Sequence, residues 1–454
     1  MRFVGGTLGA LAPFGLFLFG VSWLAFSGAP DERGFWPILL AALALGLLLA
    51  RDPKAYAENA IDGMSQRMVM LMVMAWLLAG VLGALMNSSG FVDSLVWVAT
   101  RAGVSGRWFV AAAFLVCSAV STATGTSLGT IIVCAPLLYP AGVELGSSPA
   151  VLVGAILGGA TFGDNISPVS DTTIASATSQ SADIGGVVRS RLKYALPAAL
   201  VALVFYVALG SVNMVGETAH ANTMVGGVPR GLLMLLAPAV TIGTLLKRRH
   251  LLEGLIYGIL VALAVGLVSG LLSVSDILVI DREAFVARGL IIEGMERGIG
   301  ISVFTVLLMG LVAGLEGCGV LERIIGWATK RSTTPRHAEV WIFATVSASV
   351  LLTTHSVVAI LTTGRFASEV GSAHQLSAYR RANVLDITVC TYPFLLPFFI
   401  PTILAASMTA SGLDAGLPPT SPLMAGLHNF HSWALLLMVL IAVVTGYGRG
   451  KGDS

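Results

Sequence analysis

Two carboxylates and their polar neighbours stand together in one short segment, residues 163–173, directly after an apolar run. The run, residues 151–162, contains no charged residue. An unpaired charge at the centre of a helix in lipid costs about 2.5–3.5 kcal/mol, so such a segment persists only where it lines a cavity or binds something. Its hard oxygen ligands suit a small alkali cation better than a transition metal. These candidate ligands are Asp164, Asn165, Ser167, Ser170, Asp171 and Thr172.

Two further polar interruptions fall inside apolar segments, at residues 121–127 and 352–356. A helix that breaks at membrane depth exposes free N–H groups at one new end and free carbonyls at the other. Carbonyls, hydroxyls and carboxylates suit Na⁺, while helix N-termini suit anions. The sequence therefore predicts an ion site that draws on all the interruptions. The additional candidates are Thr124, Thr126, Ser127, Thr353, Thr354, His355 and Ser356.

A buried carboxylate can hold either Na⁺ or H⁺ but not both, so competition at one group would couple the two ions. Asp164 and Asp171 are the predicted groups for this role. Asp171 is equally suited to capping a helix, because it opens the stretch Asp-Thr-Thr. His355 could sense protons or contact a substrate, or it could be a buried, hydrogen-bonded histidine.

The elements that position these residues are membrane helices. The chain has 454 residues, of which 56% are hydrophobic and 11% charged, whereas soluble domains carry about 25% charged residues. Many stretches reach the ~18 apolar residues that cross a bilayer as a helix. We therefore predict an all-α polytopic membrane protein with roughly eleven to thirteen spans. The sequence contains no phosphate-binding loop, no metalloprotease motif and no basic–aromatic surface, so neither an enzyme nor nucleic-acid binding is expected.

The second half of the chain repeats landmarks of the first. Aligning Gly319 with Gly90 gives an offset of 319 − 90 = 229, and the same offset superposes residues 353–356 on 124–127 and Pro397 on Pro168. Coincidence among glycine-, alanine- and leucine-rich helices is the alternative. Paired interruptions in two repeats are typical of secondary transporters. The predicted divisions are N-terminal spans with a surface helix, a first repeat, a linker, a second repeat and a C-terminal span, at 1–66, 67–212, 213–297, 298–412 and 413–454.

Basic residues indicate the orientation of the chain. The cluster at residues 247–250 and the basic tail at 449–451 are placed in the cytoplasm. Arg189, Arg191 and Lys193 form another basic cluster, before a span predicted from about residue 195. Residues 281–297 are charged, and we expect them to form an amphipathic helix on the membrane surface.

The segment Thr161-Phe162-Gly163-Asp164-Asn165-Ile166-Ser167-Pro168-Val169-Ser170-Asp171-Thr172-Thr173 closely resembles the signature of the NhaC family of bacterial Na⁺/H⁺ antiporters, within the ion transporter superfamily. The two-repeat plan extends the likeness over most of the chain. The resemblance implies inverted repeats with broken helices at the membrane midplane and Na⁺/H⁺ exchange in the bacterial cytoplasmic membrane. It also implies a homodimer with one part as scaffold and the other moving. No cofactor is implied, and Na⁺ is the transported ion.

The second half departs from the family pattern, because the expected Pro-Trp-Asn element is replaced by residues 391–393, Thr-Tyr-Pro. Asp386 can stand in for one of the expected acidic residues. The alternative function is therefore Na⁺-coupled transport or exchange of a small organic acid or amino acid, with Arg381, Arg365 or His355 facing its carboxylate. Arg380 and Arg381 could instead be a cytoplasmic basic pair. A channel is disfavoured because no short filter sequence is repeated.

Overall fold

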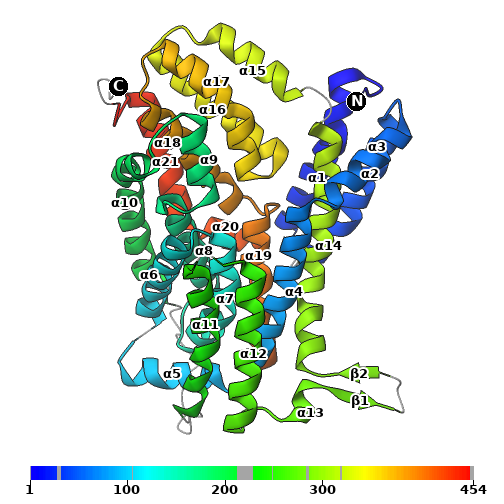
Figure 1. Ribbon diagram of the computed structural model, residues 1–454, viewed down its shortest axis with the longest axis vertical. Helices are drawn as coiled ribbons and strands as arrows, with labels where there is room; N and C mark the ends of the chain where they lie inside the picture. Colours follow the sequence, from blue (N-terminus) through cyan, green and yellow to red (C-terminus); the bar gives the residue numbers. More distant parts are fainter. Residues whose placement is uncertain are drawn as a thin grey trace.

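The computed structural model describes residues 2–27, 32–104, 106–211, 229–247, 249–282, 286–316 and 320–449. Apart from one two-stranded hairpin, these residues form helices and the loops between them (Figure 1). The prediction of an all-α polytopic membrane protein is thus confirmed.

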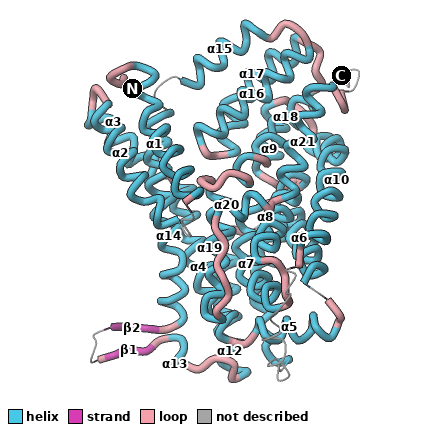
Figure 2. Tube along the Cα trace, turned by 180° about the vertical axis from the view of Figure 1, so that it is seen from behind, coloured by secondary structure: helices cyan, strands magenta, loops and turns pink. Residues whose placement is uncertain are grey.

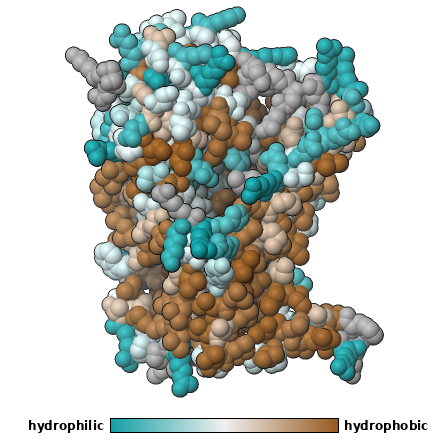
Figure 3. All heavy atoms as spheres, viewed as in Figure 1, coloured by the Kyte–Doolittle hydropathy of each residue, from teal (hydrophilic) through white to brown (hydrophobic). Residues whose placement is uncertain are grey.

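Eight helices in the described part of the chain are long and apolar enough to cross a membrane, and four shorter apolar helices accompany them. Their outward faces are hydrophobic over a broad area of the surface, whereas hydrophilic atoms gather at the two ends and across the middle of one face (Figure 3). Large apolar side chains such as Phe19, Trp23 and Val204 are more than 60% exposed, which is expected of residues that face lipid.

The first half of the chain is helical throughout its described residues. Its elements are α1 (Gly6–Phe26), η1 (Glu32–Phe35), α2 (Trp36–Leu49), α3 (Pro53–Met64), α4 (Arg67–Ser88), α5 (Phe91–Arg101), α6 (Gly106–Thr124), α7 (Ser127–Glu144), α8 (Pro149–Ile166), α9 (Asp171–Ser179) and α10 (Ile184–Leu209). Helix α10 begins well before the predicted span, so the basic cluster at residues 189–193 lies inside a helix and not ahead of one.

The linker and the second half follow. Their elements are η2 (Pro229–Leu235), α11 (Leu236–Leu246), α12 (Leu251–Ser269), α13 (Val274–Ile277), β1 (Val279–Asp281), β2 (Val286–Arg288), α14 (Leu290–Glu316), α15 (Val320–Arg331), α16 (Pro335–Thr353), α17 (Ser356–Ala373), α18 (Ala378–Val389), η3 (Tyr392–Phe394), α19 (Ile400–Met408), η4 (Thr409–Ala415), α20 (Pro422–Leu427) and α21 (Phe430–Thr445).

The predicted surface helix at residues 281–297 is wrong. Strands β1 and β2 pair antiparallel there, and α14 starts at Leu290 as a long apolar helix. The charges that suggested a separate amphipathic helix, such as Glu293 and Arg297, belong to the first two turns of α14. Charged residues are tolerated at the end of a spanning helix because that end lies near the membrane surface.

Two helical hairpins enter the molecule from opposite ends. In the α6–α7 hairpin, the Ser147 hydroxyl donates to the Gly106 carbonyl over 2.9 Å, which closes the base of the hairpin. In the α16–α17 hairpin, the base is closed by His374 Nε2 against the Ser332 carbonyl at 3.0 Å. Helix α5, which leads into the first hairpin, and α15, which leads into the second, lie at opposite ends of the molecule in both views (Figures 1 and 2).

The bounds of these elements repeat at the offset found in the sequence. Helix α16 starts at 335 and α6 at 106, and 335 − 106 = 229. The same difference separates the ends of α6 and α16, both ends of α7 and α17, the starts of α8 and α18, and both ends of α9 and α19. Offset by 229 residues, the two halves thus form hairpins of equal length, each followed by a broken helix.

The two hairpin tips also share their backbone conformation. Gly125 and Thr354, which are equivalent positions, adopt the left-handed φ angles of +71° and +52°. The next residues, Thr126 and His355, are extended N-caps with φ of −142° and −133°. Thr126 caps with its side chain, accepting from the Gly129 N–H at 3.2 Å, whereas His355 makes no side-chain cap bond.

Candidate ion-binding site

Asp164 lies near the end of α8, and the sequence explains both the helix and its end. Glycines on α8 allow a close approach to α6: a Cβ on Gly159 would lie 2.8 Å from the Cβ of Cys117, and one on Gly163 would lie 2.7 Å from the Ser118 carbonyl. Pro168 disfavours helical geometry at Ser167 and cannot donate a backbone N–H, so the helix stops. The carboxylate of Asp164 is thus held where a spanning helix breaks.

Among the residues that the structure describes, two hydroxyl groups hold the carboxylate of Asp164. Ser127, the first residue of α7, donates to Oδ2 over 2.8 Å, and Ser170, the N-cap of α9, donates to Oδ1 over 2.6 Å. The Ser170 hydroxyl also lies 3.0 Å from that of Thr172. Asp164 is only 8% exposed, and it takes part in no ion pair between described residues. A buried carboxylate with this environment can accept a cation or a proton.

Three buried polar atoms at the helix breaks have no hydrogen-bond partner within the part of the chain that the structure describes. They are Asn165 Oδ1, Thr354 Oγ1 and His355 Nδ1. Buried polar atoms are almost always paired, so each of these atoms is a place where a cation, a proton or water would be stabilised. Asn165 comes from the first half of the chain, and the other two come from the tip of the second hairpin.

Asp386 is placed differently from Asp164, because Arg191 neutralises it. Arg191 Nη1 lies 2.6 Å from Asp386 Oδ2, and both side chains are fully buried. Ser176 donates to the same oxygen over 3.0 Å, and the Asn165 side chain approaches Oδ1 at 3.5 Å. The predicted acidic ligand is thus a member of an ion pair that joins α10 to α18.

Arg191 also binds the broken helix directly. Its guanidinium donates to the Asn165 carbonyl over 2.5 Å, to the Thr173 hydroxyl over 2.9 Å and to Asn383 Oδ1 over 3.0 Å. Sequence reasoning treated Arg191 only as one of a basic cluster. A signal was present, since Arg191 lies on the same face of α10 as the buried residues Val187, Tyr194, Ala195 and Ala198.

The remaining residues predicted from the first broken helix divide between buried and exposed positions. Ser167 and Thr172 are buried, and the Ser167 hydroxyl accepts from the Val169 N–H at 3.3 Å. Asp171 is exposed and is the first residue of α9, whose N-cap is Ser170 and not Asp171. It nevertheless lies within electrostatic range of both Asp164 and His355.

The hydroxyls at the hairpin tips bond mostly to their own helices. Thr124 donates to the Val120 carbonyl over 2.8 Å, and its equivalent Thr353 donates to the Ser349 carbonyl over 2.9 Å. Ser356 instead donates to the Val389 carbonyl over 3.2 Å, at the end of α18. Each hairpin tip therefore contacts the broken helix of its own half, the first through the bond from Ser127 to Asp164.

Two of the arginines predicted to face a substrate or the cytoplasm have acidic partners. Arg380 is buried and donates to both oxygens of Glu339, over 2.9 and 3.1 Å. Arg365 pairs at the surface with Glu369 over 2.7 Å. Arg381 is 8% exposed and donates to Gln180 Oε1 over 2.9 Å, so Arg380 and Arg381 are both buried and hydrogen-bonded.

Comparisons with known proteins agree with this geometry. Residues 35–211 match the Na⁺/H⁺ antiporter family. The Na⁺/H⁺ antiporter NhaC of Alkalihalophilus pseudofirmus is 25% identical over 325 residues, 69% of each chain. The malate-2H⁺/Na⁺-lactate antiporter of Bacillus subtilis is 27% identical over 190 residues, 42% of this chain and 40% of that protein. The arginine/ornithine antiporter ArcD of Halobacterium salinarum is 29% identical over 217 residues, 46% of this chain and 42% of its own.

The apolar helices, the broken helix that carries a buried carboxylate and these relatives define a multi-pass membrane transporter and not an enzyme. Its bacterial relatives place it in the cytoplasmic membrane. Residues 35–211 are similar to the Na⁺/H⁺ antiporter family, and the chain is similar to NhaC over 69% of its length; both similarities support Na⁺-coupled antiport.

Proposed function

We propose that this chain exchanges Na⁺ for H⁺ and that both ions compete for the carboxylate of Asp164. The observation that carries the proposal is the environment of this carboxylate: it is buried, it accepts from the hydroxyls of Ser127 and Ser170, and it has no cationic partner among the described ion pairs. A serine hydroxyl can donate to a bare carboxylate, and it can turn its lone pairs toward a bound cation.

In the Na⁺-bound form, the carboxylate supplies the negative charge, and hydroxyl and amide oxygens replace part of the ion's water shell. Asn165 Oδ1 and Thr354 Oγ1 suit this role because they have no other partner in the described structure. In the proton-bound form, the carboxyl group is neutral and keeps its contacts with Ser127 and Ser170. Because one carboxylate cannot carry both ions, loading one releases the other.

Asp386 has a structural role in this proposal. Its charge is already matched by Arg191 at 2.6 Å, so a cation would have to displace a buried guanidinium to reach it. Such a displacement would leave Arg191 buried without a counter-charge, which is costly. Arg191 and Asp386 therefore hold α10, α18 and the end of α8 around the ion site while Asp164 binds the exchanged ions.

Alternating access is proposed from the arrangement of the two hairpins. The repeated bounds of the segments 106–179 and 335–408, and the entry of the hairpins from opposite ends, support two inverted repeats. Inverted repeats allow the chain to adopt an outward-facing and an inward-facing arrangement of similar energy around one site. The domain boundaries at 67–212 and 298–412 and a scaffold with a moving part are proposals on the same basis.

Labelling of the two hairpin tips tests alternating access. In a cysteine-free background, Thr126→Cys and His355→Cys would be labelled from one side with a membrane-impermeant maleimide, with and without Na⁺. Na⁺ is expected to change the two labelling rates in opposite directions, because the tips approach from opposite ends. Rates that do not respond to Na⁺ at either position would contradict alternating access at these tips.

Proteoliposomes containing the purified full-length chain test the exchange itself. An inward Na⁺ gradient should alkalinise the interior, as reported by an internal pH-sensitive dye, when no organic solute is present. Choline in place of Na⁺ is the control and should give no change. A Na⁺ gradient that leaves the internal pH unchanged would contradict Na⁺/H⁺ exchange.

A second candidate function follows from the malate/lactate and arginine/ornithine antiporters among the relatives. It is Na⁺-coupled exchange of a small organic acid or amino acid. Arg381 is the arginine best placed to serve it, because Arg380 and Arg365 are paired with glutamates. Vesicles preloaded with malate, lactate, arginine or ornithine discriminate the two functions: a Na⁺-driven pH change that requires one of these solutes would favour the second.

A homodimer is proposed from the family resemblance alone. Light scattering of the detergent-solubilised chain, corrected for bound detergent, would give a protein mass of about 47.0 kDa for a monomer. Twice that mass is the expected result. A monomer that still catalyses exchange would remove dimerisation from the proposal.

A further inference from the structure

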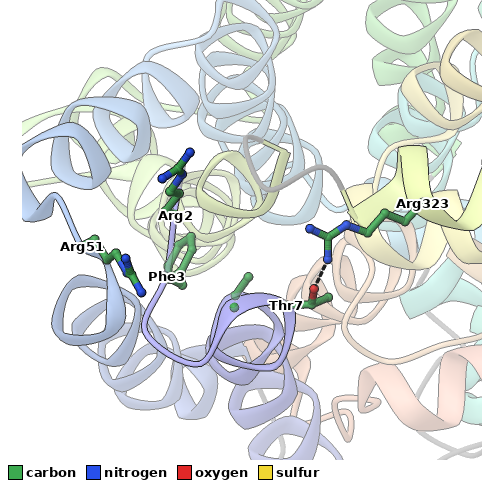
Figure 4. A pocket seen from close by; sticks show the side chains of 7 residues that line it. Arg2, Phe3, Thr7, Arg51 and Arg323 are labelled. Carbon is green, nitrogen blue, oxygen red and sulfur yellow. Dashed lines mark hydrogen bonds between the residues drawn. The ribbon is translucent and has the colours of Figure 1, made fainter.

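Three arginines from separate parts of the chain surround one cavity near the N-terminal end of α1. The cavity has a volume of about 400 Å³, and its lining includes Arg2, Phe3, Thr7, Arg51 and Arg323 (Figure 4). Arg2 precedes α1, Arg51 follows α2 and Arg323 belongs to α15. None of these residues belongs to the ion site described above.

The backbone fixes two of the arginines side by side. Phe3 and Ala50 form an antiparallel bridge, and the Arg51 N–H donates to the Arg2 carbonyl over 3.0 Å. Phe3 packs edge-on against Tyr56 of α3, with ring centroids 6.1 Å apart. Across the cavity, the guanidinium of Arg323 donates to the Thr7 hydroxyl (Figure 4). The cavity is thus built from secondary-structure contacts and is not a chance gap between side chains.

No described ion pair neutralises the three arginines around the cavity. Every described ion pair involves other groups, and none includes Arg2, Arg51 or Arg323. Guanidinium groups bind phosphate through parallel, charge-assisted hydrogen bonds, and three of them around one space favour a phosphate oxyanion.

The position of the cavity favours a lipid as the source of the phosphate. Leu8, one residue after Thr7, is 81% exposed, and Leu48, three residues before Arg51, is 78% exposed. Phe19 and Trp23 continue the exposed apolar residues along α1. The cavity therefore lies at the end of an apolar surface that acyl chains can cover, at a level where hydrophilic atoms begin to gather (Figure 3).

The geometry points to a binding site for the headgroup of an anionic phospholipid, with its phosphate held between Arg2, Arg51 and Arg323. The lipid joins the N-terminal helices α1–α3 to α15. Because α15 leads directly into the α16–α17 hairpin, the bound headgroup links the N-terminal unit to an element of the ion site.

Lipid titration of the delipidated full-length protein tests this site. Native mass spectrometry would follow binding of phosphatidylglycerol, with phosphatidylcholine as the zwitterionic comparison. An arginine near an anionic lipid surface contributes about 1 kcal/mol, so the Arg2→Gln/Arg51→Gln/Arg323→Gln variant should bind phosphatidylglycerol on the order of a hundredfold more weakly. Equal binding by the variant and the wild type would overturn the inference.

The matched control removes three exposed arginines from the opposite end of the molecule, Arg101, Arg282 and Arg288. The control changes the net charge equally and should keep phosphatidylglycerol binding within about twofold of the wild type. A control that loses binding as severely as the cavity variant would show non-specific attraction and overturn the site.

A separate measurement with inorganic phosphate distinguishes free phosphate from a lipid headgroup. Thermal stabilisation by millimolar phosphate equal to that by phosphatidylglycerol would overturn the lipid as the source.

Folding of the cavity variant is checked independently. Arg323→Gln alone removes an exposed side chain from α15 and should weaken phosphatidylglycerol binding roughly fivefold. The Arg→Lys variant at all three positions keeps the charge but loses bidentate hydrogen bonding, so it should bind with intermediate affinity. Wild-type affinity in the Arg323→Gln protein would contradict the proposed role of α15.

Discussion

The two broken helices of this protein have the same backbone plan and opposite chemistry. In the first half, Asp164 ends a helix among hydroxyls and has no cationic partner in the described structure. In the second half, the position equivalent to Asp164 at the offset of 229 is Pro393, and the buried carboxylate is Asp386, paired with Arg191. The repeat therefore preserves the starts of the broken helices and the helices that follow the breaks, whereas α18 ends at 389 and the position equivalent to the end of α8 is 166 + 229 = 395. The groups at the two breaks also differ.

Elsewhere in the buried core, charged residues of the second half stand where the first half has apolar residues. At the same offset, the buried ion pair of Glu339 and Arg380 corresponds to Val110 and Val151, and Asp386 corresponds to Leu157; all three first-half residues are buried. The first half packs apolar side chains at positions where the second half has hydrogen-bonded charged side chains. The first half thus has a buried carboxylate, Asp164, that no described ion pair neutralises, which is what competition between two cations requires.

The largest expected effect is the loss of transport when the carboxylate of Asp164 is removed. Asp164→Asn removes the buried charge that a cation could meet at the first break, a loss of about 3 kcal/mol or more, so Na⁺-driven exchange should fall at least roughly a hundredfold. Exchange is measured in proteoliposomes from the initial rate of internal pH change. Asp171→Asn is the matched variant: its side chain is exposed, and its loss should be less than about tenfold. Full exchange by Asp164→Asn would remove Asp164 from the site.

The second effect concerns stability at the other carboxylate. Arg191→Met leaves Asp386 buried without its partner, which should destabilise the protein by about 3–5 kcal/mol. Adding Asp386→Leu, the residue found at the equivalent position 157, should restore much of this loss because no buried charge then remains. Thermal unfolding in detergent measures both. Arg189→Met, at an exposed position on the same helix, is the control and should change stability by less than about 0.5 kcal/mol.

A third pair of variants compares the hairpin tips. Gly125→Ala places a side chain at a left-handed residue and within 2.7 Å of Val169, so it should destabilise the protein by about 1–2 kcal/mol. Thr354→Gly removes a β-branched side chain from the equivalent left-handed position and should stabilise the protein by about 1 kcal/mol. Chemical or thermal unfolding compares them. The two variants are expected to change the free energy of unfolding in opposite directions. Two losses of stability of equal size would contradict the equivalence of the tips.

The smallest expected change in stability concerns the ion pair of Arg449 with Glu339, which has no counterpart in the described residues of the first half. Arg449, after α21, donates to Glu339 over 2.7 and 3.1 Å, and these hydrogen bonds raise the pKa of Arg449 above its ordinary value. Arg449→Gln should cost at most about 1 kcal/mol, because its side chain is 31% exposed and Arg380 keeps Glu339 paired. A loss as large as that of Arg191→Met would show that the C-terminal segment is essential to the fold.

Much of the architecture was accessible from the sequence, because apolar runs and their interruptions are local features. The polytopic class was predicted and confirmed, and the predicted resemblance to NhaC agrees with the similarity found over 69% of the chain. The offset of 229 and the polar segments also indicated where helices break, and the structure has helix ends at 124 and 353. Periodicity could not separate the charged turns at the start of α14 from a surface helix.

The partners of the charged side chains could not be predicted. Arg191 and Asp386 are far apart in sequence, and their contact depends on how α10 packs against α18. For the same reason the sequence did not show that Arg380 is buried against Glu339. Charge counting favours the membrane surface for basic residues, and only three-dimensional packing shows which of them have a buried partner.

The ion pair of Arg191 and Asp386 also constrains how the protein is made. Arg191 is synthesised before Asp386, so α10 carries a guanidinium without this counter-charge until α18 has been made. A guanidinium inside a spanning helix is costly without a partner, so the final packing of α10 depends on a helix from the second half of the chain.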